Sequence, residues 1–103
     1  MARNVRATHN EHLRDPEVAA EYLSEALEDG DATVILMALR NIAEAQADGI
    51  SGLAQRSDLG RESMYKMLSA SGNPKLSSFT KIVHGLGLKL KVEHDPDRAA
   101  SNG

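Results

Sequence analysis

The sequence predicts a single all-α domain of five helices followed by a short C-terminal β-strand. Aromatic residues make up 3% of the 103 residues, so the core must be built from Leu, Ile, Val, Met and Ala, which suits packed helices better than a sheet. Apolar residues recur at helical spacing over most of residues 15–86. A chain of this length supports one modest core. We expect the domain to span residues 15–94, between an N-terminal arm (1–14) and a disordered tail (95–103).

The first helix is predicted to begin at Asp15-Pro16, because an acceptor side chain followed by proline is typical of a helix start. Its apolar stripe is Val18, Ala19, Tyr22, Leu23, Ala26 and Leu27. Gly30 is expected to end this helix, and Asp31 to cap a second one that runs to about Ala47. The buried side of the second helix is Val34, Ile35, Ala38, Leu39, Ile42 and Ala43.

Residues 51–69 have the spacing of two short helices joined by a tight turn, which is a helix-turn-helix unit. Ser51 is expected to cap the first of these helices. The turn should lie between Ser57 and Gly60, where Gly60 can accept a backbone conformation that costs other residues energy. The apolar residues that would hold the two helices at a fixed angle are Leu53, Ala54, Leu59, Met64, Met67 and Leu68.

The second helix of this unit, from about Arg61 to Leu68, divides into two faces at a period of 3.6 residues. Its inner face carries Met64, Met67 and Leu68, and the opposite face carries Arg61, Glu62, Tyr65 and Lys66. In DNA-binding units of this type the second helix lies in the major groove. The outward side chains are therefore the candidate base-reading residues.

The chain after this unit is predicted to form a loop, a last helix and a strand. Residues 69–74 are rich in turn residues, and the last helix should begin at about Leu76. Its inward residues would be Leu76, Phe79, Ile82, Val83 and Leu86. Leu88, Leu90 and Val92 then alternate with Lys89, Lys91 and Glu93, which is the period of a half-buried strand. Its partner would be the same strand of a second subunit, which we favour, or the extended residues 2–7.

The net charge of -3 conceals a division along the chain. Residues 1–50 hold four Arg against ten Asp or Glu, for a charge of -6. Residues 51–92 carry +5, and the tail from residue 93 carries -2. The cations of the basic segment are Arg56, Arg61, Lys66, Lys75, Lys81, Lys89 and Lys91. The predicted helix-turn-helix unit and the basic charge therefore coincide, as expected of a segment that meets DNA phosphates.

Residues 13–92 resemble the addiction-module antidote proteins, a branch of the Xre/Cro class of helix-turn-helix regulators found in bacterial toxin-antitoxin operons. The matching stretches are LRDPEVAAEYLSEALEDGD, GLAQRSDLGRESMYKMLS and SGNPKLSSFTKIVHGLGLKLKV. The resemblance implies a lambda-repressor-like fold and a type II antitoxin that represses its own operon and neutralises a small basic toxin of the RelE/ParE type. A stand-alone Xre-family repressor without a toxin is the alternative. One departure is Lys75, which stands where the class has a small hydroxyl cap and leaves Ser77 as the alternative cap.

The resemblance also implies which side chains act. The base-reading residues would be Arg61, Glu62, Ser63, Tyr65 and Lys66. The phosphate contacts would be Gln55, Asn73 and Lys75. The acidic residues that would steer a basic toxin are Glu17, Glu21, Glu25, Glu28 and Asp29. Each of these also has a simpler interpretation as a solvated surface residue, and for Tyr65 the simpler interpretation is packing on a neighbouring loop.

Several other classes of protein are disfavoured. The chain has no cysteine, no apolar run approaching the roughly 18 residues of a membrane span, and no apolar N-terminal stretch typical of a signal peptide, so we expect a cytoplasmic protein. His9 and His12 lack a third metal ligand nearby, and no cofactor site is predicted. Ser63 does not lie in a G-x-S-x-G elbow, so an enzyme is not expected. One reading helix covers only about four or five base pairs, which favours a homodimer on a palindromic operator.

Overall fold

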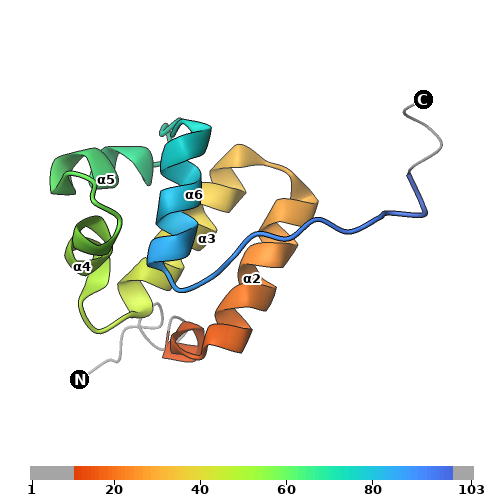
Figure 1. Cartoon of the computed structure of the whole chain (residues 1–103), viewed down its shortest axis with the longest axis horizontal. Coiled ribbons are helices and arrows are strands. Elements are labelled where there is room, and N and C mark those ends of the chain that lie inside the picture. Colours follow the sequence, from red (N-terminus) through yellow and green to blue (C-terminus); the bar gives the residue numbers. More distant parts are fainter. Residues whose placement is uncertain (1–10, 99–103) are drawn as a thin grey trace, which may run out of the picture.

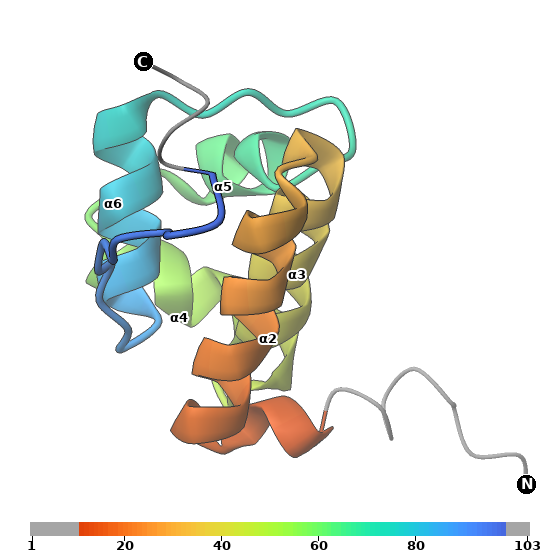
Figure 2. The same cartoon turned by 90° about the vertical axis from the view of Figure 1, so that its right-hand side faces the viewer.

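Five α-helices and a short 3-10 helix make up the regular structure in residues 11–98, the part of the chain that this computed structural model describes. They follow in the order η1 (His12–Arg14), α2 (Pro16–Asp29), α3 (Ala32–Ala45), α4 (Gly49–Arg56), α5 (Arg61–Met67) and α6 (Leu76–Gly85). α2 and α3 lie side by side, while α4 and α5 form the opposite end of the helical body (Figures 1 and 2). The all-α prediction with five helices is confirmed.

The first two α-helices begin where their sequence signals place them, and α2 ends at the predicted Gly30, whereas α3 ends at Ala45, two residues before the expected end. The Oδ1 atom of Asp15 accepts a hydrogen bond from the Glu17 amide at 2.9 Å, and Asp31 Oδ1 accepts one from the Thr33 amide at 2.8 Å. Gly30 separates the helices with a φ of 81°, a left-handed conformation that suits glycine. These caps satisfy amides that have no partner within the helix.

The core lies where α3, α4, α5 and α6 meet. Its fully buried large side chains are Leu39, Ile42, Leu53, Met64, Ile82 and Val83. α2 adds a row of small and apolar residues against α3, namely Ala19, Leu23 and Ala26. The buried Leu13 of η1 belongs to the same core, so the packed part of the chain includes a residue of the predicted N-terminal arm. The rest of that arm, residues 1–10, lies outside the described residues, as does the predicted tail beyond Arg98.

Arg56, at the end of α4, ties three parts of the fold together. Its Nε donates to the Gly85 carbonyl at the end of α6 (2.9 Å), and one terminal nitrogen donates to Gln46 Oε1 just after α3 (2.6 Å). The other terminal nitrogen pairs with the Asp48 carboxylate. Gln46 in turn donates to the Leu86 carbonyl at 3.3 Å. Arg56 therefore holds α4 against α6, and its charge is already paired within the protein.

The turn between α4 and α5 differs from the prediction in its details. α4 begins at Gly49 with Asp48 at the N-cap position, three residues before the predicted cap Ser51, which lies inside the helix. The left-handed residue of the turn is Asp58, with φ 57°, whereas Gly60 has an ordinary extended conformation at φ -66°. Asp and Asn tolerate the left-handed region better than most residues, so the expectation that Gly60 supplied this conformation was wrong.

The start of α6 corrects two further expectations. The helix begins at Leu76 with Lys75 at the N-cap position and no side-chain cap, so the alternative cap, Ser77, lies inside the helix. Leu76 was expected to face inward but is 77% exposed. The first turn of α6 projects beyond the core, and only from Phe79 onward does the apolar side of the helix meet the other helices.

The predicted C-terminal strand is not present within the described part of the chain. Residues 88–95 are extended without strand pairing, and the backbone between Lys89 and His94 makes no hydrogen bond to residues 11–98. The segment instead crosses α2 after leaving α6 (Figure 1). A strand needs a neighbouring strand to pair with, and every other described element is helical or a turn, so the alternation of Leu and Lys alone could not produce one. Asp95 to Arg98 form a turn closed by an ion pair at 2.9 Å.

Candidate nucleic-acid interface

α5 presents one polar face to solvent because its other face is held in the core. Met64 is fully buried and Leu68, directly after the helix, is 2% exposed, while Met67 packs against the core at its edge. All five predicted base-reading residues are exposed: Arg61, Glu62, Ser63, Tyr65 and Lys66. The division of α5 into an inner and an outer face is therefore confirmed, although this alone does not identify what the outer face binds.

The exposed side chains of α5 make no hydrogen bond or ion pair with any other described residue. Glu62 and Lys66 are four residues apart, a spacing that allows an ion pair on a helix, yet the structure records none between them. Arg61 and Lys66 thus keep all their donors for an external acceptor. Arg56 differs from both, because its guanidinium is committed to the fold.

The loop after α5 is held close to the end of that helix by a backbone contact at Gly72. A Cβ atom at this position would overlap the carbonyl oxygen of Met67 and lie 2.8 Å from that of Lys66. Asn73 and Lys75 follow directly, and both are exposed. Gln55 is exposed on α4. The predicted phosphate contacts thus come from both segments that flank α5.

The basic charge of residues 51–92 does not gather on one surface as the sequence pattern suggested. Arg56 is paired with Asp48, and Lys89 and Lys91 line a groove beside α2 rather than the α4–α5 region. The four remaining cations are Arg61, Lys66, Lys75 and Lys81, against the two acids Asp58 and Glu62. The positive charge around α5 is therefore smaller than the segment total.

The acidic residues predicted to meet a toxin form one exposed stripe along α2. At 100° per residue they fall within an arc of about 120° around the helix. Glu17 and Glu28 lie at one edge of this stripe and line the groove, whereas Glu21, Glu25 and Asp29 do not line it.

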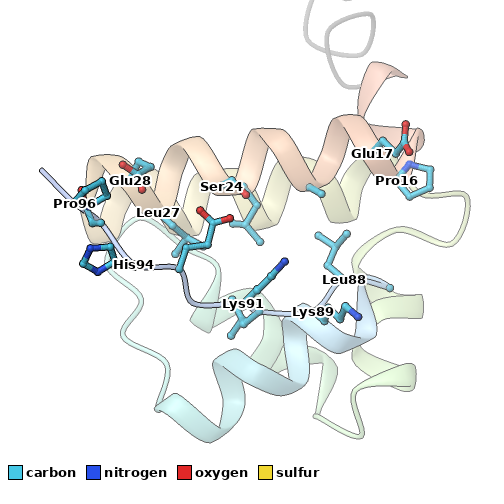
Figure 3. A pocket seen from close by; sticks show the side chains of 16 residues that line it. Pro16, Glu17, Ser24, Leu27, Glu28, Leu88, Lys89, Lys91, His94 and Pro96 are labelled. Atoms are coloured by element: carbon cyan, nitrogen blue, oxygen red, sulfur yellow. The ribbon is translucent and has the colours of Figure 1, made fainter. Parts of the chain in front are cut away.

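The groove lies between α2 and the extended segment after α6 and has a volume of about 900 Å³ (Figure 3). Leu23, Leu27, Leu88 and Leu90 contribute apolar lining. The extended segment runs along α2 in the same direction as the helix, so that Lys89 lies toward the Glu17 end and His94 toward the Glu28 end (Figure 3). No sequence pattern predicted this groove. The one signal that could have indicated it is Leu27, which belongs to the apolar stripe of α2 but is 37% exposed and lines the groove.

Comparison with known proteins assigns the family. A family model described as "Probable addiction module antidote protein" matches residues 5–94. The chain belongs to this antidote family. It is also similar to a Haemophilus influenzae (strain KW20 / Rd) protein named "Uncharacterized protein", with 36% identity over 83 residues, which cover 81% of this chain and 84% of the relative. No solved structure matches the chain significantly.

The antidote family is not a family of enzymes. Among residues 11–98, no group of three His, Asp or Glu side chains is placed to hold a metal ion. No helix in the same region is both long and apolar enough to cross a bilayer.

Proposed function

We propose that this antidote is the DNA-binding antitoxin of a bacterial type II toxin-antitoxin module, acting in the cytoplasm to repress its own operon and to neutralise a RelE/ParE-like toxin. The observation that carries the DNA-binding part is the short helix α5. It follows α4 after a four-residue turn and exposes Arg61, Tyr65 and Lys66, which have no side-chain partner among residues 11–98. Two short helices joined by such a turn are consistent with a helix-turn-helix unit of the Xre/Cro type, which supports the proposal.

In this proposal α5 enters the major groove and reads base edges. Arg61 and Lys66 donate to guanine acceptors, Glu62 accepts from a cytosine amino group, and Ser63 and Tyr65 contact bases or phosphates. Gln55, Asn73 and Lys75 bind the phosphate backbone on either side and set the register of α5 on the duplex. A homodimer places two such helices on a palindromic operator, because one helix covers too few base pairs to specify a site.

The toxin-neutralising part rests on the family description and on the charge of α2. That helix carries five acids and no Lys or Arg, so its surface attracts a basic partner. Of the five, Glu21, Glu25 and Asp29 are exposed and do not line the groove.

The test of the proposal is co-expression with the neighbouring short reading frame in the same operon. We expect that frame to arrest growth when expressed alone, and co-expression of the antidote to restore growth and allow the two proteins to be purified together. A neighbour that is harmless alone, with an antidote that still binds its own promoter, would contradict the toxin part and favour a stand-alone repressor.

Lys75→Ala is expected to weaken binding to all DNA duplexes by a similar factor, because a phosphate contact carries no sequence information. The slope of log affinity against log salt concentration should decrease by about one, since one fewer counterion is released. Binding to the operator and to a scrambled duplex would be measured at several salt concentrations. Arg98→Ala, which removes one positive charge far from α5, should leave the slope unchanged, and a loss confined to the operator would show that Lys75 reads bases instead.

A further inference from the structure

Three exposed apolar side chains lie on the same side of the α2–α3 pair. Met37 on α3 is 55% exposed, Val34 on the same helix is 39% exposed, and Val18 on α2 is 37% exposed. The Nδ2 atom of Asn41 on α3 donates a hydrogen bond to the Tyr22 hydroxyl on α2 at 2.9 Å, which marks this side. Val18 is one helical turn from Tyr22, and Met37 is one turn from Asn41. We refer to Val18, Val34 and Met37 as the apolar face of the α2–α3 pair.

This apolar face borders the edge of the acidic stripe that is opposite the groove. At 100° per residue, Glu25 and Asp29 lie within about 20° of Val18 around the axis of α2. Glu17 and Glu28, which line the groove, lie about 80–100° from Val18. One edge of the stripe therefore lines the groove, and the other edge adjoins the exposed apolar side chains.

The acids on this edge have no partner within the described part of the chain. α2 and α3 lie side by side (Figure 2), so one turn beyond the Tyr22–Asn41 hydrogen bond Glu25 lies beside Met37. Neither Glu25 nor Asp29 forms an ion pair or a side-chain hydrogen bond with any of residues 11–98. The surface thus combines an apolar centre with a charged rim, which is typical of a protein–protein interface.

The charge around this face selects the sign of its partner. Residues 15–39 hold seven Asp or Glu and no Lys, Arg or His. Of the two nearest arginines along the chain, Arg40 pairs with Glu44, and Arg14 donates through Nε to the Ala45 carbonyl at the C-terminal end of α3. Such a surface repels DNA, an anionic membrane and the same face of a second copy. It attracts a protein with a basic surface.

We propose that the apolar face of the α2–α3 pair is the docking surface for the toxin, and that the toxin meets it with an apolar patch bordered by Lys or Arg. This inference rests on the proposed function, which requires a toxin but does not locate its docking surface. The apolar side chains provide the buried contact area, and the acids steer the basic partner onto it. The flexible side chain of Met37 can adapt to the shape of a partner.

The groove on the other side of α2 is less favourable for the same partner. The segment that forms its second wall carries two lysines among its acids, namely Lys89, Lys91, Glu93 and Asp95. A basic partner in the groove would meet these lysines, whereas residues 15–39 carry no cation. α4 and α5 lie at the opposite end of the helical body from α2 (Figure 1), so docking on the α2–α3 pair leaves α5 free to bind DNA.

The experiment makes the face polar and measures the affinity for the protein encoded by the neighbouring reading frame, after its separation from the co-purified complex. In Val34→Thr/Met37→Gln the affinity should fall at least about tenfold, because an apolar centre contributes most of the binding energy. Leu27→Gln/Leu90→Gln is the matched control, since these leucines line the groove and are 37% and 40% exposed. It should bind within about twofold of the wild type. Isothermal titration calorimetry would measure the affinity, and thermal unfolding would establish that each variant is folded.

Two charge reversals separate docking from long-range attraction. Glu25→Lys and Glu28→Lys change the net charge of α2 by the same amount, but only Glu25 lies beside the apolar face. Glu25→Lys should bind the partner at least about tenfold more weakly than Glu28→Lys, because like charges then meet inside the interface. Equal losses in the two variants would mean that only the net charge of α2 matters, which would overturn the docking surface.

The outcomes distinguish this proposal from the proposed function. If the wild type binds the partner and Val34→Thr/Met37→Gln binds it equally well, the docking surface is wrong but the toxin role stands. A larger loss in Leu27→Gln/Leu90→Gln would assign the toxin to the groove. A wild type that does not bind the neighbour's protein would contradict the toxin role and the docking surface together. If Val34→Thr/Met37→Gln alone falls in mass from a dimer to the 11.1 kDa monomer, the face pairs two copies and the proposal fails.

Discussion

The double variant Arg61→Ala/Lys66→Ala is expected to bind the operator at least about 30-fold more weakly than the wild type, because each base contact contributes about 1–3 kcal/mol. Both side chains are exposed on α5 and have no intramolecular partner among the described residues, so their removal should leave the free energy of unfolding almost unchanged. Gel-shift titration at physiological salt would measure the affinity, and thermal unfolding would establish that the variant is folded.

The control for this prediction is Arg40→Ala/Arg98→Ala, which removes the same charge from positions away from α5. Arg40 pairs with Glu44 on α3 and Arg98 with Asp95 in the C-terminal turn. These exposed ion pairs stabilise little, so this variant should fold and bind the operator almost normally. Equal losses in the two double variants would mean that net charge, and not the face of α5, determines the affinity.

Leu53→Ala is expected to lower the free energy of unfolding by about 2–5 kcal/mol. Leu53 is 0% exposed and lies between α4 and α6, where its Cδ1 would be 2.8 Å from a Cβ atom at Gly85. The space left by the lost methyl groups is enclosed by two helices that Arg56 and Ser57 hold together, so it can collapse only partly. Chemical denaturation monitored by circular dichroism would measure the change.

Leu76→Ala is the matched control, because it removes the same atoms from a leucine that is 77% exposed. The sequence pattern placed both leucines in the core, so the pattern alone predicts similar losses for the two variants. The structure predicts a change within about 0.5 kcal/mol for Leu76→Ala, as is usual for surface substitutions. A loss of several kcal/mol at Leu76 would show that a partner covers this residue in solution.

The fold could be predicted from the sequence wherever a local signal determined it. The caps at Asp15 and Asp31, the stop at Gly30 and the helical spacing of apolar residues located α2, α3 and α5 closely. The sequence did not predict the exact start of α4 or which residue of the next turn has a positive φ. Several neighbouring residues can cap the helix, and more than one can adopt the left-handed conformation. The exposure of Leu76 was missed because a helical stripe does not reveal how far a helix extends past the core.

The sequence predicted which α5 side chains face outward. It did not predict the charge around α5, because Arg56 is paired with Asp48, eight positions earlier, and Lys89 and Lys91 lie beside α2. Such pairings depend on which segments meet in space. A count of charges along the chain contains no information about them.

The amino-acid sequence by itself was sufficient to predict the five helices and the two faces of α5, since each depends on residue type and on spacing within one helix, and its resemblance to the antidote proteins extends over residues 13–92. Only the tertiary structure decided that residues 88–95 lie along α2 without strand pairing, and that one edge of the acidic stripe on α2 lines a groove. The reason is physical. A helix is satisfied by hydrogen bonds within its own segment, whereas a strand, a groove or a charged surface exists only where distant segments meet.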